Sequence, residues 1–148
     1  MKRILIGIAG TVLIAVQAFC SEGAVVETKV TQGFPAKYTL SWTASTNGVV
    51  VAVPTTFYVR GEIQRAVLSG TSTGATYSLT LKDTTGVDVL AGLGATVATN
   101  AVTSFVPGIR VTDGTTTNMR PYVVNDILTL DVTVAGSNKT GAVYLYVK

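Results

Sequence analysis

The chain has 148 residues, a hydrophobic fraction of 47% and a formal net charge of +3, so it fits one domain and is too apolar to be disordered. It contains no histidine, which excludes Ser-His-Asp and Cys-His catalysis and histidine-ligated metals. Its only cysteine is Cys20, which excludes a disulfide framework and a cysteine-rich zinc site.

Residues 1–20 have the pattern of a secretory signal peptide. Lys2 and Arg3 precede an uncharged apolar run that is short for a transmembrane helix, and Val16-Gln17-Ala18 fits the small-residue rule for cleavage. Cleavage before Cys20 with lipidation of that residue is disfavoured, because Phe19 stands where a small residue is needed. The alternative is an apolar strand or helix that is retained in the folded protein.

Residues 21–148 are expected to form a single all-β domain. The chain contains 24 Thr and 23 Val, and β-branched residues favour the pleated surface of a sheet. Loss of residues 1–20 would remove two basic residues and no acid, so the net charge would fall from +3 to +1. With so small a charge and no cluster of Lys and Arg, we expect no nucleic-acid partner.

About eight short strands are predicted, separated by turn residues. Tyr38, Leu40 and Trp42 alternate with polar residues, so they should share one buried face. Gly61 is expected to mark a β-bulge within a long strand, and 113–118 to form a polar loop. The expected strands are 24–31, 37–44, 49–53, 57–68, 77–82, 87–90, 102–106, 128–134 and 143–147.

The last third of the chain has the clearest period of two. Apolar residues alternate with polar ones over 128–134 and with tyrosines over 143–147, and the glycine-bounded segment 136–141 separates the two runs. This pattern predicts an antiparallel hairpin. The whole pattern predicts an antiparallel β-sandwich that is jelly-roll-like, with an apolar N-terminal segment.

Tyr144 and Tyr146 should lie on the face opposite to Val143 and Leu145. Tyrosine offers a large contact area at low entropic cost, so this face is a possible contact surface for a partner or a sugar. The alternative is that neighbouring chain covers it.

Asp83 and Asp88 flank a glycine-containing turn, which could indicate a calcium loop or ordinary turn chemistry. Two carboxylates do not complete a calcium site, so turn chemistry is the favoured interpretation. We therefore predict no catalytic residue, no metal ligand, no cofactor and no small-molecule substrate.

Two segments carry a resemblance to a known family: YSLTLKDTTGVDVLAGLGA (77–95) and DILTLDVTVAGSNKTGAVYLYVK (126–148). Together they resemble small β-proteins encoded among the virion-structure genes of tailed bacteriophages. The resemblance extends over roughly residues 55–148. Its matching residues are Tyr77, Leu81, Asp83, Gly86, Val87, Asp88, Val89, Leu90, Leu128, Thr129, Leu130, Lys139, Thr140, Gly141, Val143, Leu145 and Tyr146.

This resemblance implies a non-enzymatic structural subunit of the virion, of the capsid decoration, cement or tail-associated type. Its expected partners are copies of itself, as a homo-oligomer, and other capsid or tail proteins. The signal-like segment at 1–20 departs from that family, since virion subunits assemble in the cytoplasm. The alternative is a secreted bacterial β-sandwich protein: an adhesin, a carbohydrate-binding module or an extracellular filament subunit.

Overall fold

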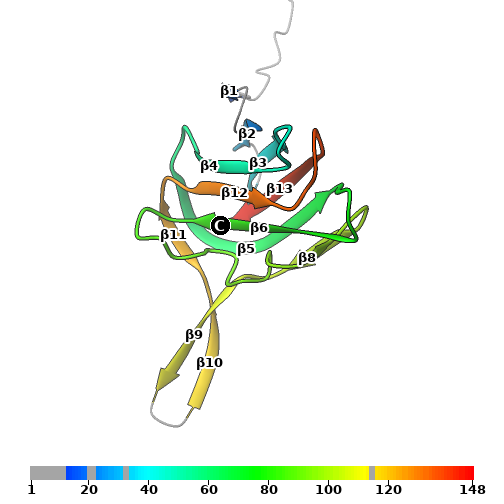
Figure 1. Ribbon diagram of the computed structural model, residues 1–148. Helices are drawn as coiled ribbons and strands as arrows, with labels where there is room; N and C mark the ends of the chain where they lie inside the picture. The colour runs from blue at the N-terminus through cyan, green and yellow to red at the C-terminus, as the bar shows by residue number, and fades with distance from the viewer. Residues whose placement is uncertain (1–12, 20–22, 32–33, 114–115) are drawn as a thin grey trace, which may run out of the picture.

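The computed structural model describes residues 13–19, 23–31, 34–113 and 116–148. All of the helices and strands assigned within these residues are β-strands, so the described part of the chain is all-β. Figure 1 shows a body of curved, stacked strands from which one two-stranded ribbon projects. The strands are β1 (Leu13–Phe19), β2 (Gly23–Val30), β3 (Ala36–Thr43), β4 (Val50–Pro54), β5 (Val59–Gly70), β6 (Thr76–Lys82), β7 (Val97–Ala98), β8 (Val102–Phe105), β9 (Gly108–Asp113), β10 (Thr116–Pro121), β11 (Val123–Asp126), β12 (Thr129–Thr133) and β13 (Thr140–Val147).

The body is an antiparallel β-sandwich with jelly-roll connectivity. One sheet has the order β1-β2-β3-β13-β5-β11, with β8 also paired to β5, and the other has the order β4-β12-β6-β7. The chain passes from one sheet to the other between β3 and β4, between β4 and β5, and between β5 and β6. The four-stranded units β3-β13-β5-β8 and β4-β12-β6-β7 are the two layers of a jelly roll. The predicted sandwich is therefore confirmed.

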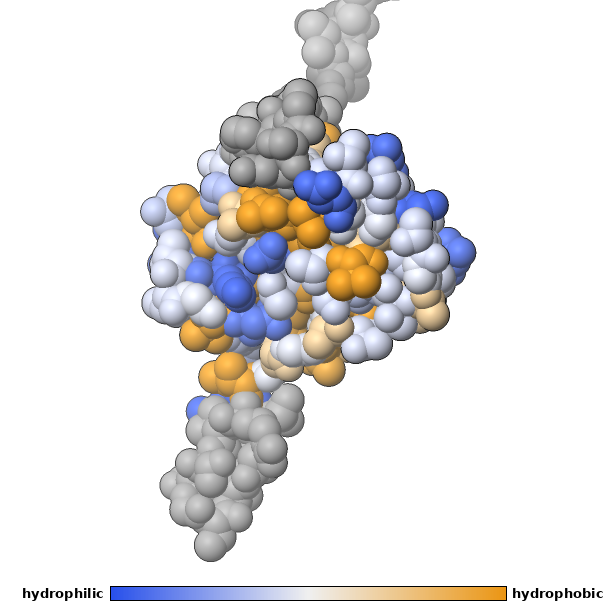
Figure 2. Space-filling model, viewed as in Figure 1, coloured by the Kyte–Doolittle hydropathy of each residue, from blue (hydrophilic) through white to orange (hydrophobic). Residues whose placement is uncertain are grey.

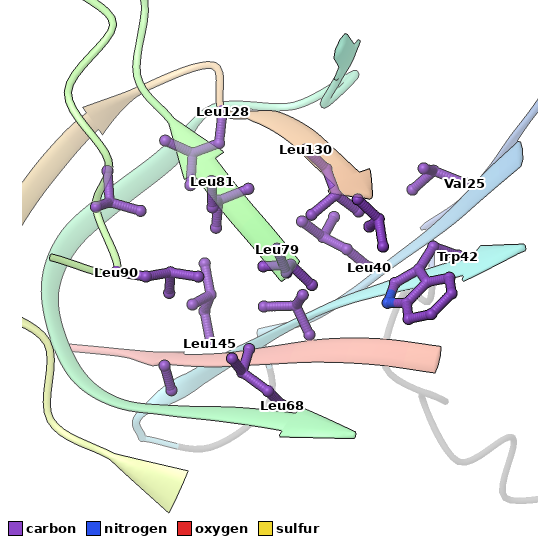
Figure 3. Packing of buried hydrophobic residues seen from close by; sticks show 14 of the residues in the cluster. Val25, Leu40, Trp42, Leu68, Leu79, Leu81, Leu90, Leu128, Leu130 and Leu145 are labelled. Carbon is purple, nitrogen blue, oxygen red and sulfur yellow. The ribbon is translucent and has the colours of Figure 1, made fainter. Parts of the chain in front are cut away.

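The core lies between the two sheets and is built from large aliphatic and aromatic side chains. Figure 3 shows Leu40 and Leu145 of the large sheet pointing toward Leu79 and Leu130 of the small sheet. The predicted alternation of residues 38–43 is confirmed, because Tyr38, Leu40 and Trp42 are buried. The largest fully buried apolar side chains are Trp42, Tyr77, Leu40, Ile63, Leu68, Leu79, Leu81, Leu90, Leu128, Leu130 and Leu145.

The predicted hairpin between 128–134 and 143–147 is wrong. β12 pairs with β4 and β6, whereas β13 pairs with β3 and β5 in the other sheet. The backbone turns the corner between them with positive φ angles at Val134 (62°), Gly136 (88°) and Asn138 (55°). The Ala135 amide also donates a hydrogen bond to the Gly48 carbonyl, so this loop contacts another turn. The sequence predicts which face of each strand is buried, but it does not predict which strands pair with each other in a sheet.

Gly61 does not mark the bulge in β5. Gly61 pairs with Val124 of β11, and the register irregularity opposite β13 falls at Gln64, between Ile63 and Arg65. Gly61 has a φ of 126°, and a Cβ there would clash with the Lys148 carbonyl, so close backbone approach accounts for the glycine. The extra residue at Gln64 resets the alternation along β5.

β1 is the edge strand of the large sheet. It pairs antiparallel with β2, from Leu13 opposite Lys29 to Phe19 opposite Gly23. The rest of the predicted signal peptide, including Cys20, lies outside the described residues. The pairing shows the arrangement of the uncleaved chain, so cleavage of residues 1–20 stays a prediction.

Candidate functional site

Tyr144 and Tyr146 lie on the outer side of the large sheet, in its central strand β13. Tyr144 stands opposite Thr39 of β3 and Val67 of β5, and Tyr146 stands opposite Lys37 and Arg65. Both tyrosines are partly exposed. The structure therefore places them on a sheet face, and their role as a contact surface stays a prediction.

Two cations stack on these tyrosine rings. The Lys37 Nζ lies 4.5 Å from the centre of the Tyr144 ring and 5.9 Å from that of Tyr146. The Arg65 Cζ lies 4.3 Å from the centre of the Tyr146 ring on the other side of β13. Such contacts fix the orientation of long side chains and leave their positive charges in place. We call Lys37, Arg65, Tyr144 and Tyr146 the tyrosine face.

The tyrosine face is surrounded by small and hydroxyl-bearing side chains. The strand alternation that buries Val143 and Leu145 turns the other residues of β13 outward, and the same holds for its neighbours. The outward residues near the rings are Thr39, Ser41 and Thr43 of β3, Val67 and Ser69 of β5, and Ala142 of β13. Farther along β5, beyond Arg65, the outward Glu62 carries a carboxylate that accepts a hydrogen bond from Gln64.

The β9–β10 ribbon projects from the edge of the large sheet. β8 and β11 pair with consecutive parts of β5, at 66–69 and 59–62, and the ribbon is inserted between them. Its strands pair only with each other among the described strands, from Asp113 opposite Thr116 to Gly108 opposite Pro121. In Figure 1 the ribbon extends well away from the body.

Apolar side chains are exposed where the ribbon leaves the body. Val106 is 59% exposed and Val123 is 69% exposed. Figure 2 shows a hydrophobic group at this root. A hollow of about 300 Å³ lies there, lined by Val106, Pro107, Gly108, Arg120 and Pro121.

The predicted polar loop 113–118 is wrong, because β9 extends to Asp113 and β10 begins at Thr116. Asp113-Gly114 after the alternating residues 109–112 was a hairpin signal that could have revealed the ribbon.

Asp83 and Asp88 serve the backbone of their own turns. The Asp83 Oδ1 accepts hydrogen bonds from the amides of Thr85 (2.9 Å) and Val87 (3.0 Å). The Asp88 Oδ1 accepts from the Leu81 amide (3.1 Å) and its Oδ2 from the Gly92 amide (2.8 Å). The segment 87–90, predicted as a strand, is a turn region held by these bonds, and only Asp88 makes an isolated bridge, to Lys82. This is the turn chemistry that the sequence analysis favoured.

Asp83 and Asp126 meet beside Tyr122, at the root of the ribbon. The Tyr122 hydroxyl donates to the Asp83 Oδ2 (2.7 Å), and the Thr84 amide donates to the Asp126 Oδ2 (3.0 Å). These bonds join the turn after β6 to β11 and to the end of the ribbon. We call Asp83, Asp88 and Asp126 the acidic corner.

Hydrogen bonding favours the ionised forms of Asp83 and Asp126. Burial alone would raise the pKa of Asp83, but hydrogen bonds from Thr85, Tyr122 and Val87 outweigh it and lower that pKa. Hydrogen bonds from Thr84 lower the pKa of Asp126. Burial, the bond to Asp83 and the surrounding negative charge raise the pKa of Tyr122 to about 12. Asp83 and Asp126 are therefore negatively charged at neutral pH.

The described residues hold no group of three or more His, Cys, Asp or Glu side chains arranged to bind a metal ion. Within the same residues, no helix is long and apolar enough to cross a membrane. No protein-family model, no curated protein and no solved structure matches the chain. A proposal for the function of this chain therefore depends on the geometry of the tyrosine face, the ribbon and the acidic corner.

Proposed function

We propose that this chain is a non-enzymatic structural subunit of a bacteriophage virion, a capsid decoration, cement or tail-associated protein. It acts through contacts with copies of itself and with other virion proteins. The observation that carries this proposal is the β9–β10 ribbon, which extends outside both sheets.

The ribbon is costly for a protein that works alone. A two-stranded hairpin is marginally stable in water unless it packs against something else, and its outer backbone groups invite pairing with another chain. The exposed Val106 and Val123 at its root add apolar surface that a partner would bury. An assembly subunit has a use for such a ribbon, because it can extend onto a neighbour.

The virion setting draws on two further points. Double-sheet jelly rolls occur in viral capsid domains, although a fold alone does not determine function. The resemblance of 77–95 and 126–148 to phage virion proteins supports the same setting.

One observation favours a second candidate, a secreted adhesin, carbohydrate-binding module or extracellular filament subunit. Residues 1–20 have the signal-peptide pattern, which a cytoplasmic assembly does not need. Sequencing the N-terminus of the mature protein by mass spectrometry distinguishes the two. Met1 retained in a purified particle supports the virion subunit, and a new N-terminus at residue 19 or 21 in the culture medium supports the secreted protein.

The test of assembly replaces the ribbon, Gly108–Pro121, with a two-residue Asn-Gly turn that joins Pro107 to Tyr122. The parent and the variant are compared by sedimentation velocity and by cosedimentation with purified capsids and tails. We expect the variant to keep its fold and to lose association by at least about tenfold, since β9 and β10 pair with no other described strand and the ribbon is the part that would reach a partner. Equal association of the two proteins would contradict the proposal, and so would a parent that binds glycans on an array but no particle.

A further inference from the structure

The tyrosine face and the acidic corner carry opposite charges on different parts of the molecule. The face lies on the outer side of β3, β13 and β5, whereas the corner lies where the turn after β6 meets the end of β11. Two unlike surfaces on one subunit suit a head-to-tail contact between identical copies.

The positive charge of the tyrosine face is available to a partner. Lys37 and Arg65 rest on tyrosine rings, which hold them in place without neutralising them. The outward residues beside the rings are hydroxyl-bearing or apolar, and the carboxylate of Glu62, farther along β5, accepts a hydrogen bond from Gln64. A flat, preorganised patch of rings and cations binds an anionic surface at little entropic cost.

The acidic corner is continuous with the ribbon that needs a partner. Tyr122 directly follows β10, and its hydroxyl donates a hydrogen bond to Asp83, so the corner and the ribbon root are joined. The root exposes Val106, Val123 and Arg120, with Val123 opposite Glu62 on the outer side of β11, whereas the ionised Asp126 stands opposite the buried Val59. Asp83 and Asp126 offer negative charge for Lys37 and Arg65, and the exposed valines of the root offer apolar area for the tyrosine rings.

We propose that the tyrosine face of one copy docks onto the acidic corner and ribbon root of a second copy of this chain. The inference rests on the proposed assembly function and names the partner and both contact surfaces. Because the two surfaces differ, the contact is heterologous and repeats from subunit to subunit, giving a ring if the rotation closes and a filament if it does not. Charge complementarity sets the orientation and the association rate.

A matched pair of charge reversals tests the face. Arg65→Glu and Lys139→Glu change the net charge equally, but Lys139 lies in the loop before β13, away from the face. We expect R65E to weaken self-association by at least about tenfold and K139E to leave it near the parent level. Salt should weaken the parent contact and have little effect on R65E. Equal behaviour of the two variants would overturn the inference.

Mixing two variants tests the head-to-tail arrangement. K37E/R65E disables the face and keeps the corner, while D83N/D126N removes corner charge and keeps the face; asparagine retains an acceptor oxygen for the turn bonds. Each variant alone should stay monomeric, and their equimolar mixture should form a dimer and nothing larger, because one good pair of surfaces remains. A mixture that stays monomeric, or variants that still assemble alone, would overturn the inference.

The two proposals fail in different ways. If K37E/R65E keeps parental self-association but loses binding to capsids or tails, the face docks a different virion protein, so the inference fails and the proposed function stands. If the parent chain neither self-associates nor binds particles, the proposed function fails as well. Urea unfolding followed by Trp42 fluorescence checks that each variant is folded, since Trp42 is buried.

Discussion

Removing the carboxylate of Glu27 should loosen the junction between the two sheets. Glu27 is only 1% exposed and lies on the inward face of β2. Its Oε2 accepts hydrogen bonds from the amide and the hydroxyl of Thr56, both at 2.9 Å, in the loop that carries the chain from β4 to β5. Because β4 and β5 belong to different sheets, this carboxylate connects β2 of the large sheet to the crossover between the sheets.

The expected cost of Glu27→Ala follows from those bonds. Thr56 is exposed, so its hydroxyl can turn to water, and the main loss is the bond from its amide to the carboxylate. A hydrogen bond to a charged group contributes about 1.5–3 kcal/mol, and the buried methylene groups add roughly 0.8 kcal/mol each. We expect E27A to lower the free energy of unfolding by about 2–4 kcal/mol, which for a domain of this size lowers Tm by roughly 5–15 °C.

Urea unfolding measures this difference directly. Trp42 is the single tryptophan and is 1% exposed, so its emission reports the core. Glu27→Gln keeps one acceptor oxygen and should cost less than E27A. Glu62→Ala is the matched control, because Glu62 is only partly buried and bonds a side chain two residues away. Equal stabilities of E27A and E62A would refute the reasoning.

Three further predictions concern packing and pH. Gly141→Ala should cost about 1–3 kcal/mol of unfolding free energy, measured in urea, because the new Cβ would clash with the Trp42 ring. The pKa of Tyr122, raised to about 12, contributes stability that is fully present below pH 10 and is lost as pH rises through about 12. Absorbance titration of the parent and of Y122F should show one tyrosine with this raised pKa in the parent only, and identical titration curves would contradict the prediction. The lowered pKa values of Asp83 and Asp126 give stability that is present above pH 3.8 and lost as pH falls further, so D83N/D126N should flatten acid unfolding followed by circular dichroism.

The sequence predicts faces well and neighbours poorly, for a physical reason. The alternation of Tyr38, Leu40 and Trp42 depends only on local geometry, so burial followed from the pattern. Whether β12 pairs with β13 depends on three positive φ angles in the intervening loop and on strands far away in the chain. Period-two patterns carry no information about those long-range pairings.

The residues of the candidate site also divide into those that local sequence patterns predict and those that depend on long-range pairing. Tyr144 and Tyr146 could be placed on a face, since strand parity determines it. Their stacking with Lys37 and Arg65 required knowledge of which strands flank β13. The hydrogen bond from Tyr122 to Asp83 joins residues 39 positions apart, so no local sequence motif predicts it.

The position of β13 has a consequence for how the protein is made. This strand follows the other described strands in the chain and lies in the middle of the large sheet between β3 and β5. Until residues 140–147 have left the ribosome, the two flanking strands have no shared neighbour, so the large sheet cannot close before that point. Its closure is slow, as for other topologies dominated by distant pairings.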